Sequence, residues 1–581
     1  MNRTHTNGEL RLSDVGKEVK LVGWVAKKRK FRNILFVDLR DRYGITQVVF
    51  DEEILGSIPD LRNEYVLEVS GVVLKKEVAN PKLKTGEIEV SIREFEILNT
   101  AKTTPFMIQD ETDGLEDLRL EYRYLDLRRP IIQEKLIMRD RVTGIIRNFL
   151  HELNFIEVET PILGKSTPEG ARDYLVPSRL YHGNFYALPQ SPQIFKQLLM
   201  VGGLDRYFQV ARCFRDEDLR ADRQPEFTQI DIEMSFVEEK DIFEVVEKMM
   251  KKIFKDIKSI DLPKFKVIKY VDAMERYGSD KPDLRFGNEL LDVSTIFKNT
   301  EFTIFKNVLE NGGLIKALVF KDIADQLSKK DFEKLQNYVK KYGAKALAYL
   351  KYQDEISGSI AKVLSDNEKE ELKAKLNIGN NDVVFMIADS YKVVSAALGA
   401  LRVKLAKDFN LINQDSYEFA WIVDFPMYEY SEEEQRFVAA HHPFTSPKIE
   451  DIDKLIDDKA NCYSRAYDLV LNGYELLSGS IRIHNQELQA KVFEALGLSL
   501  EEAKDKFGFF LEAFEYGAPP HGGVGIGLER LIMILSNTDN IKDVVAFPKT
   551  ASASDLMSGA PNDVDIKQLK DLGIALITKE N

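Results

Sequence analysis

Two cations are predicted to lie in the first turns of helices, where the helix dipole disfavours positive charge. In QSPQIFKQLLM, residues 190–200, we expect Ser191 as the N-cap and Pro192 as the first helical residue, which places Lys196 near the positive end. Lys196 therefore either extends into water, the default expectation, or holds an anion. Arg530, in HGGVGIGLERLIMIL, precedes an apolar run. Its guanidinium needs an anion, and a polyphosphate would fit its planar fork.

A second group of charges lies in residues 209–236, which read as strand, polar loop, strand. The flanking strands, which look half buried, carry Arg215, Glu217, Gln229, Asp231 and Glu233. Buried charges persist only with partners. Mutual salt bridges would satisfy them as well as a ligand would, so both interpretations stay open.

A third group lies in residues 467–484, where strand-forming residues are mixed with Asp468, Glu475 and Arg482. The two carboxylates could hold Mg²⁺ through oxygen ligands, which is how phosphate substrates usually bring their metal. The alternative is a salt bridge to Arg482. His441 and His442 precede Pro443, and adjacent side chains point to different sides, so they favour hydrogen bonding or anion binding over a shared metal.

The first hundred residues alternate like short strands and predict a small antiparallel barrel. Residues 26–32, AKKRKFR, form a basic run that includes Arg29 and Phe31. Phe36 shares a strand face with charges, and Gln47 lies between apolar residues. A ring, an amide and cations suit single-stranded nucleic acid. A solvated loop and an ordinary exposed phenylalanine are the alternatives.

Composition and motifs bound the remaining possibilities. The 581 residues predict about three to five domains, and the net charge of −14 argues against a protein that binds polyanions over its whole surface. Cys213 and Cys462 lie far apart and outside any CxxC. No apolar stretch reaches the roughly 18 residues of a membrane span, so we expect a cytoplasmic protein. Gly523, Gly525 and Gly527 lack the full dinucleotide fingerprint and indicate close approach by a planar ligand or another strand.

The order of the elements can also be estimated from periodicity. From Arg141 onward, apolar residues recur at helical spacing, and a strand is expected at residues 155–161. Residues 287–414 are Lys-rich and lack the dense His, Arg and Gly clusters found on either side, which indicates an inserted domain. No candidate site residue lies within it, so its removal is expected to spare the chemistry.

Several of these segments resemble a known family. FRDEDLRADRQPEFTQID and GVGIGLERLIMIL look like the second and third signature motifs of class II aminoacyl-tRNA synthetases, and the helix ending in FIEVETPIL, with Pro161, looks like the first. TPEGARDYLVPSR, QSPQIFKQ, SDKPDLR, RYLDLRRP, HHPFTSP and AFPKT resemble the aspartyl-tRNA synthetases of the bacterial type. The resemblance covers nearly the whole chain, in order.

The resemblance implies an α+β multidomain architecture with an OB-fold barrel, an antiparallel class II catalytic sheet with flanking helices, and an inserted α+β domain. The expected boundaries are 1–105 for the anticodon-binding OB-fold, 106–130 for a hinge, 131–286 and 415–555 for the two parts of the catalytic domain, 287–414 for the insertion and 556–581 for a C-terminal extension. It also implies a homodimer formed through the first motif, with Ile162 and Leu163 in the interface, and no membrane partner.

The resemblance further implies a role for each matching residue. Aspartate would be bound by Glu169, Ser191, Gln193, Lys196, Asp231, His441 and Arg482, and ATP by Arg215, Glu217, Gln229, Glu475 and Arg530. Arg215 and Arg530 would be catalytic. His442 would also line the site, Mg²⁺ would accompany ATP at Asp468 and Glu475, and the anticodon would meet Arg29, Phe31, Phe36 and Gln47.

The expected reaction is the activation of L-aspartate with ATP and its transfer to tRNA(Asp). The lysine and arginine in the amino-acid pocket favour a carboxylate over an amide. Alternatives are an enzyme that also aspartylates tRNA(Asn), or a non-catalytic tRNA-binding paralogue. One departure from the family is that Leu477, Ser478 and Gly479 stand where members often have three glycines.

Overall fold

The computed structural model describes residues 3–56, 60–167, 171–432 and 435–577. The chain divides into two compact units, each built from segments that are separated in sequence. The first comprises Met1–Arg141, Leu219–Gln224 and Thr538–Asp565, and the second comprises Val142–Asp218, Pro225–Asn537 and Ile566–Asn581. No helix in the described part of the chain is both long and apolar enough to cross a lipid bilayer.

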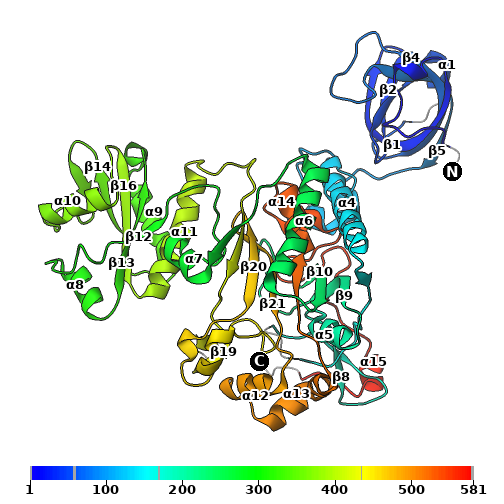
Figure 1. The fold of residues 1–581 in the computed structure, drawn as a ribbon. Coiled ribbons are helices and arrows are strands. Elements are labelled where there is room, and N and C mark those ends of the chain that lie inside the picture. Colours follow the sequence, from blue (N-terminus) through cyan, green and yellow to red (C-terminus); the bar gives the residue numbers. More distant parts are fainter. Residues whose placement is uncertain (1–2, 57–59, 168–170, 433–434, 578–581) are drawn as a thin grey trace. The chain divides into compact units, whose positions relative to one another are not determined.

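The first unit contains the expected barrel, closed in the order β1-β2-β3-β5-β4 (Figure 1). Its strands are β1 (Glu18–Phe31), β2 (Ile34–Arg40), β3 (Ile45–Phe50), β4 (Val66–Lys75) and β5 (Ile88–Asn99). Leu35, Val37 and Leu39 are buried in its core, as the alternation predicted, and Phe36 lies on the opposite strand face. The alternative of a solvated loop for the basic run is wrong, because residues 27–31 belong to β1 and a tight turn at Arg32, with φ of 53°, separates it from β2.

The barrel is followed by short helices tied together by arginines. They are α2 (Glu116–Glu121), α3 (Arg123–Asp126) and the beginning of α4 (Pro130–Glu152), while the short helix α1 (Glu52–Leu55) lies within the barrel segment, between β3 and β4. Buried Asp126 accepts from Arg123 at 2.5 Å and from Arg129 at 2.6 Å. Arg123 also donates to the carbonyl oxygen of Ala546 at 2.9 Å. This network accounts for the dense charges of RYLDLRRP, since each buried charge has a partner.

The second unit is built on an eight-stranded sheet in the order β11-β17-β20-β21-β22-β10-β9-β6. Its strands are β6 (Ile156–Glu157), β9 (Arg206–Phe214), β10 (Glu226–Ser235), β11 (Lys266–Lys269), β17 (Phe419–Val423), β20 (Ala466–Leu471), β21 (Tyr474–Ile481) and β22 (His521–Gly527). The central pairs are antiparallel, and only the two edge pairs are parallel. The expected antiparallel sheet is therefore present, although the strand expected at residues 155–161 has only two residues.

One face of this sheet is closed by α6 (Glu239–Lys258). Phe243 stacks on Trp421 with ring centroids 4.0 Å apart, and the ring of Tyr467 meets Phe243 edge-on at 5.1 Å. A Cβ on Gly522 would lie 3.0 Å from Ile242, so the helix packs closely over β22. Since side chains alternate between the two faces of a strand, the opposite face is left for the polar residues of the same strands.

Further helices complete this part of the unit. They are α5 (Gln193–Val201), α7 (Tyr270–Tyr277), α12 (Gln486–Ala495), α13 (Leu500–Ala513), α14 (Leu528–Leu535) and α15 (Ile566–Asp571). Two hairpins, β7 (Leu175–Pro177) with β8 (Phe185–Ala187) and β18 (Tyr428–Ser431) with β19 (Arg436–Ala439), lie outside the large sheet. Helix α5 begins at Gln193 with Pro192 in the N-cap position, one residue later than expected, so Ser191 is not its N-cap.

The Lys-rich segment forms its own five-stranded sheet in the order β12-β13-β16-β14-β15. The strands are β12 (Leu290–Asp292), β13 (Leu314–Phe320), β14 (Ala348–Tyr352), β15 (Ile356–Gly358) and β16 (Asp382–Asp389), and the helices are α8 (Thr303–Glu310), α9 (Lys329–Lys340), α10 (Asp366–Lys375) and α11 (Tyr391–Asp408). Helices α9 and α11 cover one face of the sheet, while α8 and α10 contribute to a second core on the other (Figure 1). The expected α+β character of this segment is confirmed.

The glycines of β22 generate a prediction about stability. A Cβ on Gly523 would lie 2.0 Å from the carbonyl oxygen of Ile232, whereas one on Gly527 would meet nothing closer than 3.8 Å. We expect Gly523→Ala to destabilise the second unit by about 3 kcal/mol or more, because a backbone oxygen on a central strand cannot move aside. Gly527→Ala, the matched control, should change stability by less than about 0.5 kcal/mol. Calorimetric melting of both variants measures this, and equal small shifts would contradict the close approach.

Candidate active site

The free face of the large sheet brings the predicted residues into rows. One row runs across five strands through Asp468, Ser478, Gly525, Asp231 and Gln209, each paired with the next. Directly paired residues of neighbouring strands point to the same face. Three segments far apart in sequence, with the expected metal carboxylate at one end and the expected ammonium ligand near the other, thus share one surface.

A parallel row, two residues further along the strands, carries the second half of the site. It pairs Ser480 with Gly523 and Gly523 with Glu233. The strand in the middle of both rows is β22, which presents Gly523, Gly525 and Gly527 to this face, with buried His521 at the start of the strand. Adjacent strands lie about 4.8 Å apart, so Asp231 and Asp468, three strands apart, are separated by about 14 Å across a floor that lacks large side chains on β22. An elongated ligand with unlike charges at its two ends would fit this floor.

Four buried charges form the end of the floor near β10. Lys196 of α5 lies 2.8 Å from Asp231 Oδ1 and 3.2 Å from Glu233 Oε2. Arg482 binds Glu233 with two nitrogens, Nε to Oε1 at 2.9 Å and Nη2 to Oε2 at 3.1 Å. All four side chains are at most 2% exposed. Lys196 therefore holds anions rather than extending into water, and the alternative pairing of Arg482 with Asp468 or Glu475 is replaced by pairing with Glu233.

The two carboxyls of this cluster respond differently to their surroundings. Burial raises the pKa of Asp231 to about 6, although Lys196 opposes the shift. Burial would also raise the pKa of Glu233, but Arg482 and Lys196 together lower it to about 2. Glu233 is thus the permanent partner of the two cations. Asp231 carries its charge at neutral pH at a cost that an additional cation would relieve.

Two buried polar atoms at this end also need a partner. Within the described part of the chain, Asp231 Oδ2 and Gln193 Nε2 have no hydrogen-bond partner. Buried polar atoms are rarely left unsatisfied, so such atoms mark a place for a ligand or water. An ammonium group would satisfy the carboxylate oxygen, and a carbonyl or carboxylate oxygen would satisfy the amide nitrogen.

Both histidines line the site, and both are held neutral. His442 Nε2 lies 2.8 Å from Nη1 of Arg482, and because arginine only donates, this nitrogen accepts. Burial and then Arg482 hold the pKa of His442 well below its usual value. Burial also lowers the pKa of His441 to about 4, although Glu475 opposes the shift. His441 meets Phe425 edge-on at 4.8 Å, so the two rings have separate environments and do not form a metal pair.

The other end of the row carries Asp468 and Glu475. Burial and the nearby Glu475 raise the pKa of Asp468 well above its usual value. Among the described residues, Asp468 Oδ1 has no hydrogen-bond partner and no group of three or more His, Cys, Asp or Glu side chains could hold a metal. Two carboxylates with an unsatisfied buried oxygen suit Mg²⁺, which binds through one or two carboxylates and keeps waters and substrate phosphates.

Arg530 lies beside the same carboxylates. Its Nη1 donates to the carbonyl oxygen of Glu475 at 2.7 Å and lies 3.9 Å from Oε1 of that residue. The anion expected near Arg530 is thus partly supplied by the chain itself. Arg215 is half buried, with its guanidinium over the ring of Phe227 at 5.1 Å, at the start of the polar loop that follows β9. Glu217 and Gln229 are also half buried, and Gln229 pairs with Gly527 across the sheet.

The departure at residues 477–479 has a local explanation. Ser478 pairs with Asp468 across β20 and β21, and the hydrogen bond from its hydroxyl opposes the rise that burial and Glu475 cause in the pKa of that carboxyl. Leu477 points to the other face, where it is buried. Gly479 is required by packing, because its Cβ would lie 2.2 Å from the carbonyl oxygen of Gly523. The floor is thus altered only by one small hydroxyl.

The remaining predicted residues lie elsewhere. In the barrel of the first unit, Arg29 lies over the ring of Phe36 at 5.1 Å, and Gln47 Nε2 donates to Glu89 at 3.0 Å. Phe31 is 60% exposed, with Arg32 at 5.4 Å from its ring centre. A cation, two rings and an amide thus share the barrel surface. Glu169 lies outside the described residues.

Glu233 is the site residue that the sequence reasoning left without a role. It follows Gln229 and Asp231 at the spacing of one strand face, so the alternation of polar residues along β10 was the available signal. Ser480, which accepts from Arg482 Nη1 at 2.6 Å, was hidden by its small size. The one signal for Ser480 in the sequence is that it lies two residues before Arg482, which is the spacing of one strand face.

Comparison with known proteins agrees with this geometry. Residues 115–551 match the family model described as tRNA synthetases class II (D, K and N), and residues 19–98 match the model described as OB-fold nucleic acid binding domain. The fold of the chain resembles an aspartyl-tRNA synthetase from Leishmania major Friedlin, with a TM-score of 0.59 and 20% identity over 94% of each chain. It also resembles asparaginyl-tRNA synthetase from Pyrococcus horikoshii complexed with asparaginyl-adenylate, with a TM-score of 0.57 and 18% identity over 95% of this chain and 99% of the other.

Relatives of higher identity cover both chains. An aspartate–tRNA ligase from Shouchella clausii is 53% identical over 100% of both chains. An aspartate–tRNA(Asp/Asn) ligase from Caldanaerobacter subterraneus subsp. tengcongensis is also 53% identical, over 99% of this chain and 98% of the relative. The expected fold class and family resemblance are confirmed, and the chain belongs to the class II tRNA synthetases of the D, K and N group, with an OB-fold domain at its N-terminal side.

Proposed function

We propose that the chain is an ATP-dependent aspartate–tRNA ligase that forms aspartyl-adenylate and transfers the aspartyl group to the 3′ end of tRNA(Asp) for translation in the cytoplasm. The observation that carries this proposal is the glycine floor, with a buried pair of cations at one end and a pair of carboxylates at the other. Relatives that are 53% identical over the whole chain bear the name of this activity.

Aspartate would bind by replacing some of the ion pairs within the buried cluster of Lys196, Asp231, Glu233 and Arg482. Its ammonium group would bind Asp231 together with Ser191, Gln193 and Glu169, which relieves the cost of the buried Asp231 charge. Its side-chain carboxylate would then meet Lys196 and Arg482, with His441 alongside. Asparagine would bring the same ammonium group but an uncharged side-chain amide in place of the side-chain carboxylate. Its amide NH₂ would face the donors of Lys196 and Arg482, and this buried mismatch would reject it.

ATP would lie along the remaining floor. Arg215 would bind the α-phosphate and the substrate's α-carboxylate, Glu217 the adenine amino group, Gln229 the adenylate, and Arg530 the γ-phosphate. Mg²⁺, held by Asp468 and Glu475, would supply positive charge against the phosphates. The enzyme's residues position the reactants and neutralise charge, and no covalent nucleophile is needed.

The bond changes follow from this placement. An oxygen of aspartate's α-carboxylate attacks the α-phosphorus of ATP, and the bond to the bridging oxygen breaks to release pyrophosphate. The terminal ribose hydroxyl of the tRNA then attacks the activated carbonyl, and AMP leaves. A paralogue without catalysis would be expected to lack Arg215, Arg530, Asp468 or Glu475, and all four are present.

The barrel would bind the anticodon through Arg29, Phe31, Phe36 and Gln47. The segments 1–105, 106–130, 131–286, 287–414, 415–555 and 556–581 remain the proposed domains. We also propose a homodimer, with Ile162 and Leu163, which are 43% and 52% exposed, in the interface. Charging of tRNA(Asn) is the alternative, because some relatives carry the double name Asp/Asn.

The central experiment is ATP–pyrophosphate exchange without tRNA. Aspartate should support exchange and asparagine should not, because two buried cations require a carboxylate. Lys196→Met should lower kcat/KM for aspartate by roughly 150-fold or more, since a buried charge pair is broken. Lys248→Met, which removes an exposed helical lysine paired with Glu244, is the matched control and should behave like the wild type. Equal exchange with asparagine would overturn the assignment of the pocket.

The pKa of Asp231 predicts a pH dependence of aspartate binding. Its raised value, about 6, means that the carboxylate that attracts the ammonium group is present above this pH and is lost as the pH falls through it. Free aspartate keeps its own side-chain charge down to about pH 4, and Glu233 stays ionised. We expect kcat/KM for aspartate in the exchange reaction to fall about tenfold per pH unit below this inflection.

Asp231→Asn tests the origin of that inflection. The variant should lose it and, at pH 8, should show kcat/KM reduced by roughly 10- to 150-fold, because a charged hydrogen bond is removed. An inflection that persists unchanged in Asp231→Asn would assign the titration to another group.

Aromatic substitutions in the barrel test the anticodon proposal. Phe36→Ala should lower kcat/KM for aspartylation of tRNA(Asp) by roughly 5- to 150-fold while leaving exchange unchanged, because one stacked base is worth about 1–3 kcal/mol. Tyr43→Ala, an exposed barrel aromatic that also lies under an arginine, is the matched control. We expect the wild type to prefer tRNA(Asp) over tRNA(Asn), and Phe31→Ala to change that ratio. Equal kcat/KM on both transcripts would show a relaxed enzyme.

A further inference from the structure

One side chain of the inserted segment, Arg402, is hydrogen-bonded to the loop 283–288 at the start of the insertion. Arg402 of α11 is only 1% exposed, and its guanidinium donates to four backbone carbonyl oxygens of this loop. Nε donates to Asn288 at 2.8 Å, and Nη2 lies within donor distance of Asp283 at 3.0 Å, Phe286 at 3.0 Å and Gly287 at 2.8 Å. Its charge also lies over the rings of Phe286, at 4.1 Å, and Tyr277, at 4.9 Å. Burial lowers the pKa of Arg402 to about 10, so it remains charged at neutral pH.

The helix that carries Arg402 is fixed against the catalytic sheet's own helix α7. A Cβ on Gly278, which ends α7 with φ of 66°, would lie 2.3 Å from the carbonyl oxygen of Ser395, and one on Gly399 would lie 2.6 Å from the carbonyl oxygen of Gly278. Lys316 of β13, also buried, donates to the carbonyl and the carboxylate of Glu275 at 2.9 and 2.5 Å. These close contacts leave α11 little freedom to move relative to α7.

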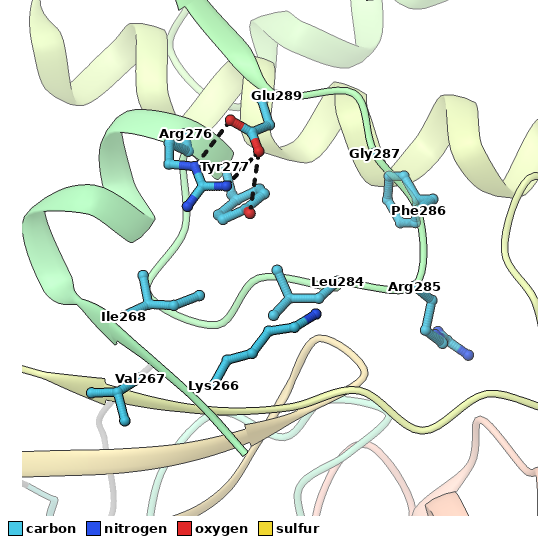
Figure 2. Close-up of a pocket in the computed structure, with 10 residues that line it drawn as sticks. All are labelled: Lys266, Val267, Ile268, Arg276, Tyr277, Leu284, Arg285, Phe286, Gly287 and Glu289. Atoms are coloured by element: carbon cyan, nitrogen blue, oxygen red, sulfur yellow. Dashed lines mark hydrogen bonds and ion pairs between the residues drawn. The ribbon is translucent and has the colours of Figure 1, made fainter. Parts of the chain in front are cut away.

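The same loop also borders a cavity. Its volume is about 550 Å³, and it is lined by Lys266, Val267, Ile268, Arg276, Tyr277, Leu284, Arg285, Phe286, Gly287 and Glu289. Figure 2 shows residues 284–287 crossing its edge, with Arg276 and Tyr277 directed at Glu289 on the far wall. Each cation that lines the cavity is paired with a carboxylate of the chain, so these cations do not require a bound anion. The cavity residues are thus occupied with one another, whereas Arg402 donates directly to the carbonyl oxygens of the loop.

The loop in turn contacts the hairpin that carries the candidate metal carboxylates. Gly473, in the turn between β20 and β21, has φ of 85°, and its Cβ would lie 3.2 Å from the Cβ of Asp283. Lys281 lies 3.6 Å from Glu475. On the other flank of the insertion, Asn472 of the same turn accepts from Glu418 N and donates to the carbonyl oxygen of Ser416, both at 2.9 Å. Both flanks of the inserted segment therefore meet at this turn.

We infer that Arg402 is a positioning residue that, through the loop 283–288, holds the turn at residues 472–473 and so sets the placement of Asp468 and Glu475 toward magnesium-bound ATP. The inference rests on the proposed function of these two carboxylates. It reverses the expectation from sequence that the insertion is dispensable for activation, because Arg402, a residue of the insertion, donates to four carbonyl oxygens of this loop.

Arg402→Met tests the inference, with Arg276→Met as the matched control. Arg276 lies at the same junction, at 5.0 Å from the ring of Tyr277, but its hydrogen bonds go to Glu289 and not to the loop. In ATP–pyrophosphate exchange, we expect Arg402→Met to raise the half-saturating Mg²⁺ concentration by roughly 10-fold or more, the range for loss of an outer-sphere support. The KM for aspartate, whose site is three strands away, should stay unchanged, and Arg276→Met should match the wild type in both.

A second measurement uses the ligand-free protein and does not depend on activity. In hydrogen–deuterium exchange, Arg402→Met should accelerate the backbone amides of residues 279–288 and 470–476, while those of β9 keep their wild-type rates. Arg402→Lys, which keeps the charge but loses the planar fork, should give smaller changes of the same kind and serves if the methionine variant does not fold.

The outcomes separate the two proposals. Absence of aspartate-dependent exchange in the wild type would overturn the proposed function. An active wild type with Arg402 variants indistinguishable from Arg276→Met in Mg²⁺ dependence would overturn the inference alone. Uniformly faster amide exchange throughout the second unit would also overturn it, since Arg402 would then serve stability only.

Discussion

The buried cluster of Lys196, Asp231, Glu233 and Arg482 is the constraint around which the second unit is arranged. Removing four charges from water is expensive, and the cost is offset only when each charge has well-placed partners. The partners come from α5, β10 and the residue that directly follows β21, so these three segments must meet within hydrogen-bond distance. The unequal pKa values of the two carboxyls follow from this placement, because Glu233 touches both cations whereas Asp231 touches only Lys196.

The cluster also explains the glycines of β22. That strand lies between the strands of Glu233 and Arg482, and a side chain at Gly523 would meet the Glu233 carboxylate at 2.2 Å. Glycine there lets the ion pair form across the strand, and glycine at Gly525 and Gly527 continues the same open face. The floor for a ligand and the space for the ion pair thus have one structural cause. The sequence left two explanations for the glycines, close approach by a planar ligand or by another strand. The neighbouring strands pack closely against them, and the open floor leaves room for a ligand, so both explanations apply.

The predictable part of the molecule was that governed by local periodicity or by short motifs. Alternation along β2 correctly placed Leu35 and Phe36 on opposite faces, and the strand-loop-strand order of residues 209–236 was correct. Pairing between distant segments left no local signal, so Lys196 was expected in water although its partners lie 35 and 37 residues further along the chain. A solvated loop remained one interpretation of the basic run because charge runs are usually solvated, whereas β1 continues through it to Phe31.

The two ends of the site are supported in different ways, and this difference explains the position of the insertion. The end near β10 is held by buried ion pairs between the sheet and α5, which fix its geometry without outside help. The carboxylate end is held differently, because Asp468 and Glu475 repel each other and the cations that approach Glu475, Lys281 and Arg530, are partly exposed. Their spacing must come from backbone, and the turn that joins their strands needs external contacts to be rigid. Loop 283–288 and residues 416–418 supply those contacts, and they are the two points where the inserted segment leaves and rejoins the catalytic sheet. Because both ends of the insertion meet at that turn, the insertion stiffens the part of the floor where the repulsion between Asp468 and Glu475 would otherwise separate the strands.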